Sequence, residues 1–300
     1  MYKISNIYFF FLEYKYKLII FVFVLFNLII ELVYKNKILN ICICTIGKLE
    51  NKYINEFLEY YRNYGVDKIF LYDNNDINGE TFMISPKYIK DNYIEIINWR
   101  GQKKRQLTFF ENCYKNNYKN YDWFIFYDID EYLNLTNYSD IHQYLSQSKF
   151  QRCQLIYLYW RLHTDNDKMF FENKTLFERF PNYYNKNDYF IGKSIIRGNI
   201  DDIFFDSPHY IDNNLKKCND IYYIEHYEFK STEEFINKIN YKGDVRFENN
   251  EQFKYKRIFR YFKFNKISFD KIIYIANKTK LNATFLISKL LSNDKYFFIY

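Results

Sequence analysis

Three acidic residues end an apolar run in the stretch YDWFIFYDIDEYLNL, at Asp128, Asp130 and Glu131. If the chain stays extended there, Asp128 and Asp130 project to the same side of a strand. Two such carboxylates repel each other unless a cation lies between them. Hard oxygen ligands in an incomplete set favour Mg²⁺ or Mn²⁺, completed by water and a diphosphate. On this motif alone, a solvated strand end with Asp as a helix cap is an equally good interpretation.

Strands and helices alternate before this run and must position it. Strands are predicted over four short apolar segments: Ile38–Cys44, Asp67–Tyr72, Tyr93–Ile97 and Asp122–Tyr127. The first helix is indicated by apolar residues at helical spacing (Ile54, Phe57, Leu58 and Tyr61) with Gly65 at its C-cap, and a second is predicted over Gln102–Asn117. This alternation predicts a largely parallel sheet in a three-layer α/β fold.

In an open parallel sheet, ligands bind at the carboxyl ends of the strands. Asp73 follows the strand KIFLY and is expected at the same edge as Asp128. An Asx turn in the segment DNND would explain Asp73 comparably well. Further along, Cys153–Trp160 and Lys193–Arg197 are predicted strands, and Ser231 with Glu234 forms a capping box that begins a helix.

The N-terminal segment Leu18–Tyr34 is nearly continuous apolar sequence with lysines on both sides. Its length suits a helix spanning a thinner bilayer, and no small-residue cleavage site follows, so we expect an uncleaved membrane anchor. Lysines on both flanks leave its orientation open. The net charge of +7 comes from dispersed residues. Because no block of Lys or Arg marks a nucleic-acid-binding arm, nucleic acid is not an expected partner.

The five cysteines (Cys42, Cys44, Cys113, Cys153 and Cys218) lack the spacing of a zinc site. We therefore expect buried thiols. Five N-x-[ST] sequons occur, at Asn134, Asn137, Asn173, Asn277 and Asn282. In so Asn-rich a chain they do not establish secretion.

The order of motifs between residues 38 and about 245 resembles glycosyltransferase family 92 and related family 2-like sugar transferases of the GT-A fold. The matching segments are YINEFLEYYRNYGVDKIFLYDNND, CYKNNYKNYDWFIFYDIDEYL, YWRLHTDND, FERF, KSIIR, SPHY and EHYEFKSTEEFINKI. The resemblance implies a GT-A-type three-layer α/β/α nucleotide-sugar-binding domain over 38–245. Residues 1–37 would carry the anchor, and 246–300 would form a C-terminal extension of unknown role.

The resemblance also implies a nucleotide-sugar donor of the UDP-sugar class. Asp73 would bind the base or ribose. Asp128 and Asp130 would hold the divalent cation, Mn²⁺ or Mg²⁺, against the diphosphate, with Glu131 orienting the loop or capping the next turn. Lys193 and Arg197 in KSIIR could meet diphosphate oxygens, although lysines alternating along a strand are often simply solvent-facing.

A further metal ligand in such sites is commonly His. His209 in SPHY and His226 in EHYEF stand at the family's His positions, and either could serve. A structural histidine bonded to backbone is the alternative for each. Where the family often has a second His two residues before the first of these, this chain has Ser207.

An inverting transferase needs a general base beside the acceptor hydroxyl. Asp165 aligns with the family's Asp in a Gly-Asp-Asn turn, with Thr164 in place of the Gly, and Asp167 is the reserve candidate. A solvated acidic turn is the alternative. Trp160 could stack on an acceptor sugar or be a core residue.

The sequence thus favours a membrane-anchored, metal-dependent, inverting transferase that acts on a glycan, glycoprotein or glycolipid. In a eukaryotic host it would face a Golgi- or ER-type lumen, and in a bacterium the cytosolic face of the membrane. A non-catalytic GT-A domain that binds glycans or scaffolds other enzymes is the main alternative. A DxD phosphatase is disfavoured because Tyr132 stands where those enzymes usually have Thr or Val.

Overall fold

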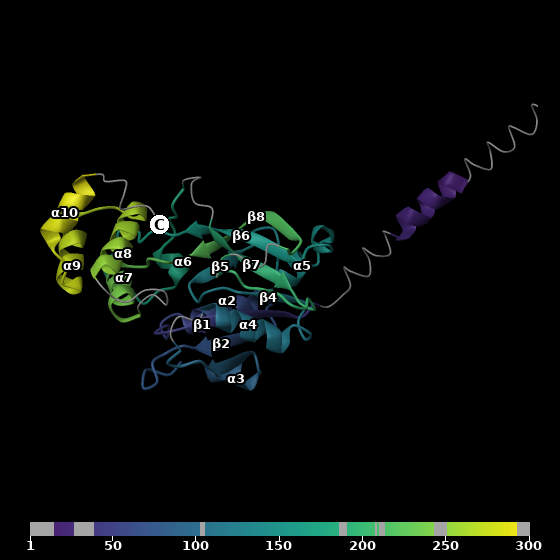
Figure 1. The fold of residues 1–300 in the computed structure, drawn as a ribbon, viewed down its shortest axis with the longest axis horizontal. Helices are drawn as coiled ribbons and strands as arrows, with labels where there is room; N and C mark the ends of the chain where they lie inside the picture. The colour runs from purple at the N-terminus through teal and green to yellow at the C-terminus, as the bar shows by residue number, and fades with distance from the viewer. Residues whose placement is uncertain are drawn as a thin grey trace, which may run out of the picture.

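The computed structural model describes residues 15–26, 39–102, 106–185, 191–207, 209, 214–242 and 251–292. These residues form a mixed α/β structure around an eight-stranded sheet of order β3-β2-β1-β4-β7-β6-β8-β5 (Figure 1). The strands are β1 (Ile41–Gly47), β2 (Lys68–Asp73), β3 (Ile94–Asn98), β4 (Trp123–Ile125), β5 (Glu131–Asn134), β6 (Leu155–Leu162), β7 (Gly192–Arg197) and β8 (Lys217–His226).

The four strands β1 to β4 are parallel to one another, as the alternating pattern predicts. The rest of the sheet is mixed. β7 is antiparallel to β4 and to β6, β6 is parallel to β8, and β5 is antiparallel to β8. The expectation of a largely parallel sheet therefore holds for the N-terminal half only. β8 was not predicted, and along most of its length exposed residues alternate with half-buried or buried ones.

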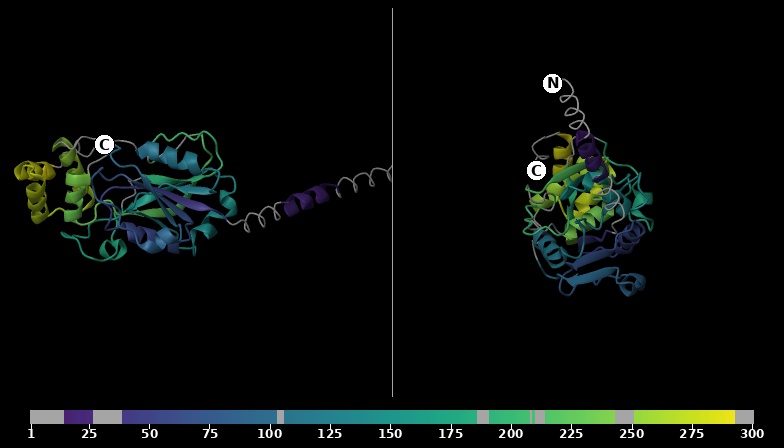
Figure 2. Two further views of the ribbon diagram at one scale, coloured as in Figure 1. Left: turned by 90° about the horizontal axis from the view of Figure 1, so that it is seen from below. Right: turned by 90° about the vertical axis from the view of Figure 1, so that its right-hand side faces the viewer.

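Helices lie on both faces of the sheet (Figure 2). Their bounds are α2 (Ile54–Asn63), α3 (Pro86–Lys90), α4 (Gln106–Asn117), α5 (Ile141–Leu145), η1 (Ser148–Phe150), α6 (Leu176–Arg179), α7 (Thr232–Asn237), η2 (Lys238–Lys242), α8 (Glu251–Phe264), α9 (Phe269–Thr279) and α10 (Ala283–Leu291). Helix α2 packs with Ile41 and Ile43 of β1, whereas α4 packs with Cys42 and Cys44 of the same strand. Because successive strand residues point to opposite faces, the two helices enclose the sheet between them.

Two local signals in the sequence are confirmed. The residues expected on the apolar side of α2 are its buried ones, and Gly65 follows the helix with φ +84°, a conformation that glycine adopts at little cost. At α7 the Ser231 side chain accepts from the Glu234 amide, and the Glu234 side chain accepts from the Ser231 amide. This is the predicted capping box.

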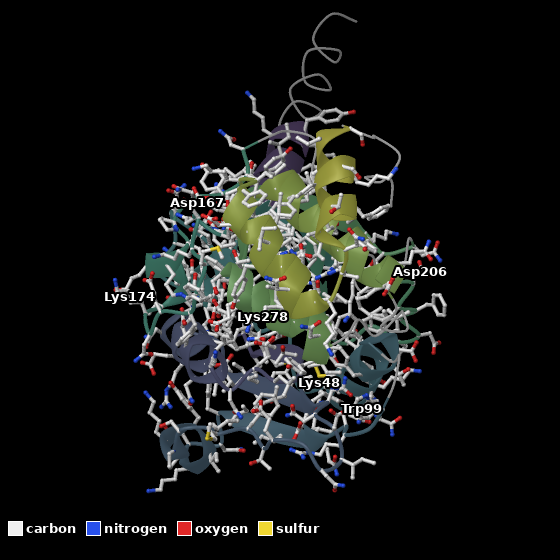
Figure 3. All side chains as sticks on the ribbon, turned by 90° about the vertical axis from the view of Figure 1, so that its left-hand side faces the viewer. Lys48, Trp99, Asp167, Lys174, Asp206 and Lys278 are labelled. Carbon is white, nitrogen blue, oxygen red and sulfur yellow. A yellow bond between two sulfur atoms is a disulfide. The ribbon has the colours of Figure 1, made fainter. Side chains whose placement is uncertain are left out.

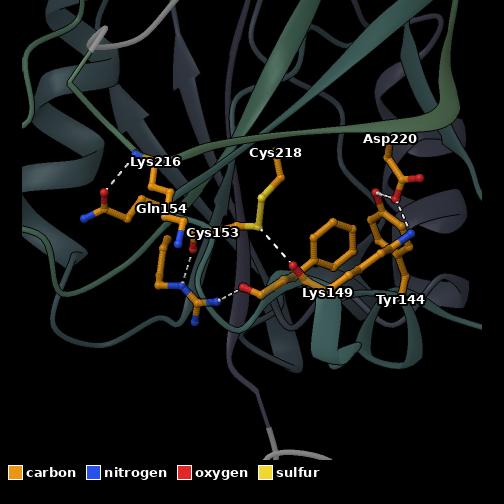
Figure 4. The surroundings of a disulfide bond; sticks show 9 residues. Tyr144, Lys149, Cys153, Gln154, Lys216, Cys218 and Asp220 are labelled. Carbon is orange, nitrogen blue, oxygen red and sulfur yellow. Dashed lines mark hydrogen bonds and ion pairs between the residues drawn. A yellow bond between two sulfur atoms is a disulfide. The ribbon is translucent and has the colours of Figure 1, made fainter.

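The cysteines are not all thiols, so that expectation is wrong. Cys44 of β1 is joined to Cys113 of α4, and Cys153 is joined to Cys218 of β8, while Cys42 is free and buried. Figure 4 shows the second disulfide near the hydrogen bond that the Lys216 backbone amide donates to the Gln154 side chain. The partners are far apart in sequence, so only the fold brings them to bonding distance.

The described part of the C-terminal extension is helical. Helices α8 to α10 lie together at one end of the molecule (Figure 1). They share a third apolar cluster with α7 and with the end of β6, through residues such as Phe235, Ile258 and Leu162. The extension is therefore packed on the domain rather than separate from it.

Residues 15–26 form a helix, which covers the first part of the predicted anchor. The remainder of that prediction, residues 27–34, lies outside the described residues. Among the described residues, no helix combines the length and the apolar character needed to cross a membrane.

Candidate functional site

The acidic segment turns sharply instead of staying extended. After β4, Phe126 and Tyr127 are buried, and the Glu131 amide donates to the Asp128 carbonyl at 3.0 Å. The turn packs directly on the end of β1, because a Cβ at Gly47 would lie 2.7 Å from the Ile129 side chain. Glycine at this position allows the turn to approach β1 closely, and the two aspartates are directed to different partners.

Asp128 pairs with a buried lysine from the neighbouring strand. Its Oδ2 accepts from Lys193 Nζ at 2.9 Å, and a third of the Asp128 side chain is exposed. Desolvation is the largest single effect and opposes ionisation, but the charge and the hydrogen bond of Lys193, with smaller contributions, together lower the pKa of the Asp128 carboxyl. Since β7 brings Lys193 to the end of β4, these two predicted site residues lie together.

Glu131 orients the turn, which is the secondary role expected of it. Its Oε2 accepts from the Asp128 amide at 3.0 Å, and its Oε1 lies 3.5 Å from Lys193 Nζ. Burial raises the pKa of the Glu131 carboxyl well above its ordinary value. Glu131 therefore lies close to both Asp128 and Lys193 at the base of the turn.

Asp130 is buried and faces three groups from the C-terminal half of the domain. Lys230 Nζ and Lys238 Nζ each lie 3.3 Å from Asp130 Oδ2, and His226 Nε2 lies 3.7 Å from Oδ1. Burial lowers the pKa of His226 to about 4, so the imidazole is neutral at physiological pH. A neutral imidazole beside a carboxylate is a combination that binds divalent metals.

Both candidate histidines contact the ring of Trp160. The ring centroids of Trp160 and His226 are 4.2 Å apart, and those of Trp160 and His209 are 5.0 Å apart. His209 Nδ1 lies 3.3 Å from the Gly192 carbonyl oxygen, whereas His226 faces Asp130. Of the two, His226 is thus the one placed beside the acidic turn.

Asp73 lies at the same edge of the sheet, at the end of β2, but its carboxylate is engaged. Oδ1 accepts from the Asn75 backbone and side chain, and Oδ2 accepts from Arg100 Nε at 2.8 Å. Arg100 also donates to the carbonyls of Gly79 and Glu80. The Asx-type contact and the arginine together shape the loop after β2.

Arg197 is not brought to this edge. In the antiparallel register it lies opposite Trp123, at the start of β4, whereas Asp128 follows the strand's end. Its guanidinium stacks over the Trp123 ring and donates to the carbonyls of Phe150 and Cys153. These contacts join β7 to the η1 turn.

The two candidate bases, Asp165 and Asp167, differ in the solvent exposure of their side chains. Asp165 is buried, and its Oδ2 contacts both the Tyr261 hydroxyl and Lys271 Nζ, the latter at 2.8 Å. Asp167 is half exposed, at 51%, and its Oδ1 lies 2.9 Å from Lys271 Nζ. The hydrogen bond from Lys271 lowers the pKa of Asp167. In Figure 3, which faces the C-terminal helices, Asp167 lies at the rim of the molecule.

Three basic residues at this edge were not predicted: Lys230, Lys238 and Arg100. Lys230 lies inside the motif EHYEFKSTEEF, four residues after His226, so its position was available in the sequence. Lysine is abundant in this chain, however, and nothing local distinguishes a site lysine from a solvent-facing one. Lys238 lies in the same family-matching segment, EHYEFKSTEEFINKI, whereas for Arg100 we find no signal in the sequence.

The sequence model of glycosyltransferase family 92 matches residues 37–272. A family 92 protein of Oryza sativa subsp. japonica is 28% identical over 104 residues, which cover 33% of this chain and 17% of the rice protein.

Two solved structures are weakly similar. TarS of S. aureus has a TM-score of 0.38 at 12% identity, over 74% of this chain and 43% of TarS. UDP-glucose pyrophosphorylase complexed with UDP-glucose has a TM-score of 0.28 at 11% identity, over 53% of this chain and 76% of that one. Such scores support no argument about ligands. This chain covers less than half of the rice protein and of TarS. The family match, in contrast, spans well over half of the 300 residues, so the chain belongs to glycosyltransferase family 92.

Proposed function

We propose that this chain transfers a sugar from a nucleotide-sugar donor of the UDP-sugar class to a hydroxyl of a glycan, glycoprotein or glycolipid, using a GT-A-type domain. Family membership supports glycosyl transfer. The observation that carries the proposal is the arrangement at Asp130, where a buried carboxylate meets His226 and two lysines at the carboxyl end of β4. In parallel sheets this edge is where nucleotide ligands bind.

A divalent cation fits part of this arrangement. In the part of the chain that the structure describes, no three His, Cys, Asp or Glu side chains are placed to hold a metal ion. Asp130, in the turn between β4 and β5, and His226, at the end of β8, nevertheless form a pair. Mg²⁺ or Mn²⁺ commonly takes few protein ligands and completes its shell with water and phosphate oxygens. Asp130 and His226 would hold the ion, with Asp128 nearby. When bound, it would act as a Lewis acid on the leaving diphosphate.

Transfer with inversion requires a base on the acceptor side. Asp165 has its carboxylate enclosed by Tyr261 and Lys271, whereas Asp167 has half of its side chain in solvent. Of the two predicted bases, Asp167 is the one that an acceptor hydroxyl can reach. Its lowered pKa keeps it ionised, and so able to accept a proton, at neutral pH.

We further propose that the chain is attached to a membrane through residues 18–34 and that its domain faces an oxidising compartment. The two disulfides support this orientation, since such bonds persist in secretory compartments and are rare in the cytosol. Protease treatment of sealed microsomes should leave the domain intact until detergent is added. Digestion without detergent would show that it faces the cytosol.

The enzymatic proposal is tested by release of UDP from a panel of UDP-sugars with Mn²⁺. We expect turnover by the unmodified chain and a loss of about a hundredfold or more in Asp130→Asn, because that carboxylate serves both the metal and the donor site. Asp270→Asn, an exposed position on α9, is the matched control. Binding of a UDP-sugar without turnover would favour a non-catalytic domain. If no UDP-sugar binds or reacts with metal present, the proposal fails.

A further inference from the structure

We propose that Lys230 and Lys238 bind the diphosphate of the donor and that they exchange Asp130 for its oxygens when donor and metal enter. In the ligand-free protein, the two ammonium groups neutralise the carboxylate that the metal would use. Metal and nucleotide therefore bind cooperatively, each weakly without the other. The inference rests on the proposed function and adds two donor-binding residues and an order of events to it.

Both lysines contact the same oxygen atom of Asp130. Lys230 Nζ and Lys238 Nζ are each 3.3 Å from Asp130 Oδ2, and they come from opposite ends of α7. The Lys230 side chain is 6% exposed and the Lys238 side chain 24%. The two ammonium groups share the Asp130 carboxylate, and the buried Glu50 carboxylate also interacts electrostatically with Lys230. Ammonium groups that share one carboxylate oxygen can bind an anion such as a diphosphate as a further partner.

A metal on the same carboxylate would change this balance. A divalent cation held by Asp130 and His226 would stand within a few ångströms of both ammonium groups, and like charges at that range repel strongly in a poorly hydrated site. The repulsion is relieved if the lysines turn toward diphosphate oxygens, which carry the opposite charge. Charge-assisted hydrogen bonds from lysine to phosphate then replace those to the carboxylate.

Each lysine has a second contact that keeps it at the site during this exchange. Lys230 Nζ lies 4.4 Å from the centre of the Tyr53 ring, a cation–π distance. Lys238 Nζ lies 3.3 Å from the Glu228 carbonyl oxygen. Neither contact depends on Asp130. The ammonium groups can therefore turn away from the carboxylate while their stems stay in place.

Cooperativity of this kind is reciprocal. Replacing one of the lysines should nevertheless change the affinities for UDP and for Mn²⁺ alone in opposite directions. Replacing either lysine by Met removes a diphosphate contact, so UDP should bind about tenfold or more weakly in the presence of Mn²⁺. The same replacement removes a positive charge beside Asp130, so Mn²⁺ alone should bind roughly fivefold more tightly. A merely structural lysine would not tighten metal binding.

The experiment compares Lys230→Met and Lys238→Met with the unmodified chain. The affinities for UDP and for uridine are measured by calorimetry, and the affinity for Mn²⁺ alone by its electron paramagnetic resonance signal. Lys174→Met is the control, since the Lys174 side chain is largely exposed and pairs with Glu172. Uridine affinity should stay unchanged in all three, because uridine has no diphosphate. Should Lys230→Met fold poorly, Lys238→Met, whose side chain is more exposed, provides the same comparison.

The inference is overturned if the lysine variants bind UDP as tightly as the unmodified chain, or if they bind Mn²⁺ alone no more tightly than it does. Equal losses for uridine and UDP would also overturn it, since the effect would not lie at the diphosphate. Absence of UDP binding by the unmodified chain would remove the proposed function, and this inference with it. The first three outcomes leave the proposed function standing.

Discussion

Asp165 and Asp167 are only two residues apart, yet they should respond differently to substitution. Asp165→Asn leaves the buried Lys271 with a weakened partner, and loss of a buried ion pair costs about 3 kcal/mol of unfolding free energy. Asp167 is half exposed, so Asp167→Asn should cost less than about 1 kcal/mol. If Asp167 is the base, that variant should lose about a hundredfold or more in kcat.

Denaturant unfolding and sugar transfer, measured on the same preparations, separate these roles. A fully stable Asp165→Asn would show that its buried contacts contribute little. An Asp167→Asn enzyme with normal kcat would move the base elsewhere.

At the residue scale, the acidic residues at the carboxyl end of β4 could be predicted from the sequence, but the lysines that pair with Asp130 could not. Asp128 and Asp130 could be recognised because carboxylates directly after an apolar run are unusual. Lys230 and Lys238 could not, because their importance arises only when α7 is docked against the turn. Arg197 illustrates the converse. It shares the motif KSIIR with Lys193, but an antiparallel strand carries the two ends of that motif to opposite edges of the sheet.

At the scale of elements, the disulfide between β1 and α4 should contribute to the free energy of unfolding. Cys44 and Cys113 are 69 positions apart, and removing such a link should lower the free energy of unfolding by about 3 kcal/mol. The double variant Cys44→Ala/Cys113→Ala tests this under non-reducing conditions, with Cys42→Ala as the control. Thiol titration of the denatured, non-reduced chain should find Cys42 alone. Five reactive thiols before reduction would contradict the pairing.

Several elements could not be predicted from the sequence, for different physical reasons. The strands β1 to β4 and the helices α2 and α4 could be recognised from local apolar runs and periodicity, whereas the five-residue helix α3 was not predicted. Strand β8 was also not predicted, and exposed residues interrupt its more buried ones for most of its length. The cysteine pairs were missed because bonding distance depends on the packing of β1 on α4, which spacing along the chain does not encode.

At the scale of the whole molecule, the C-terminal helices are joined to the site by charge as well as by apolar contact. Glu228, two residues after His226, pairs with Arg257 and Arg260 of α8. On α9, Lys271 holds both candidate bases. The extension thus supports both the metal side and the acceptor side of the proposed site.

Two truncations of the full chain should therefore behave in opposite ways. Removing residues 1–37 takes away the predicted anchor and none of the described core, so the remaining chain should be soluble and release UDP at an unchanged rate. Removing residues 251–300 exposes the apolar side of α7 and leaves Glu228 and Asp165 without their cationic partners, so we expect aggregation and loss of UDP release. Membrane fractionation and size-exclusion chromatography distinguish the two. A stable, active chain ending at residue 250 would show that the helices α8 to α10 are dispensable, and a membrane-bound chain beginning at residue 38 would place the attachment outside the anchor.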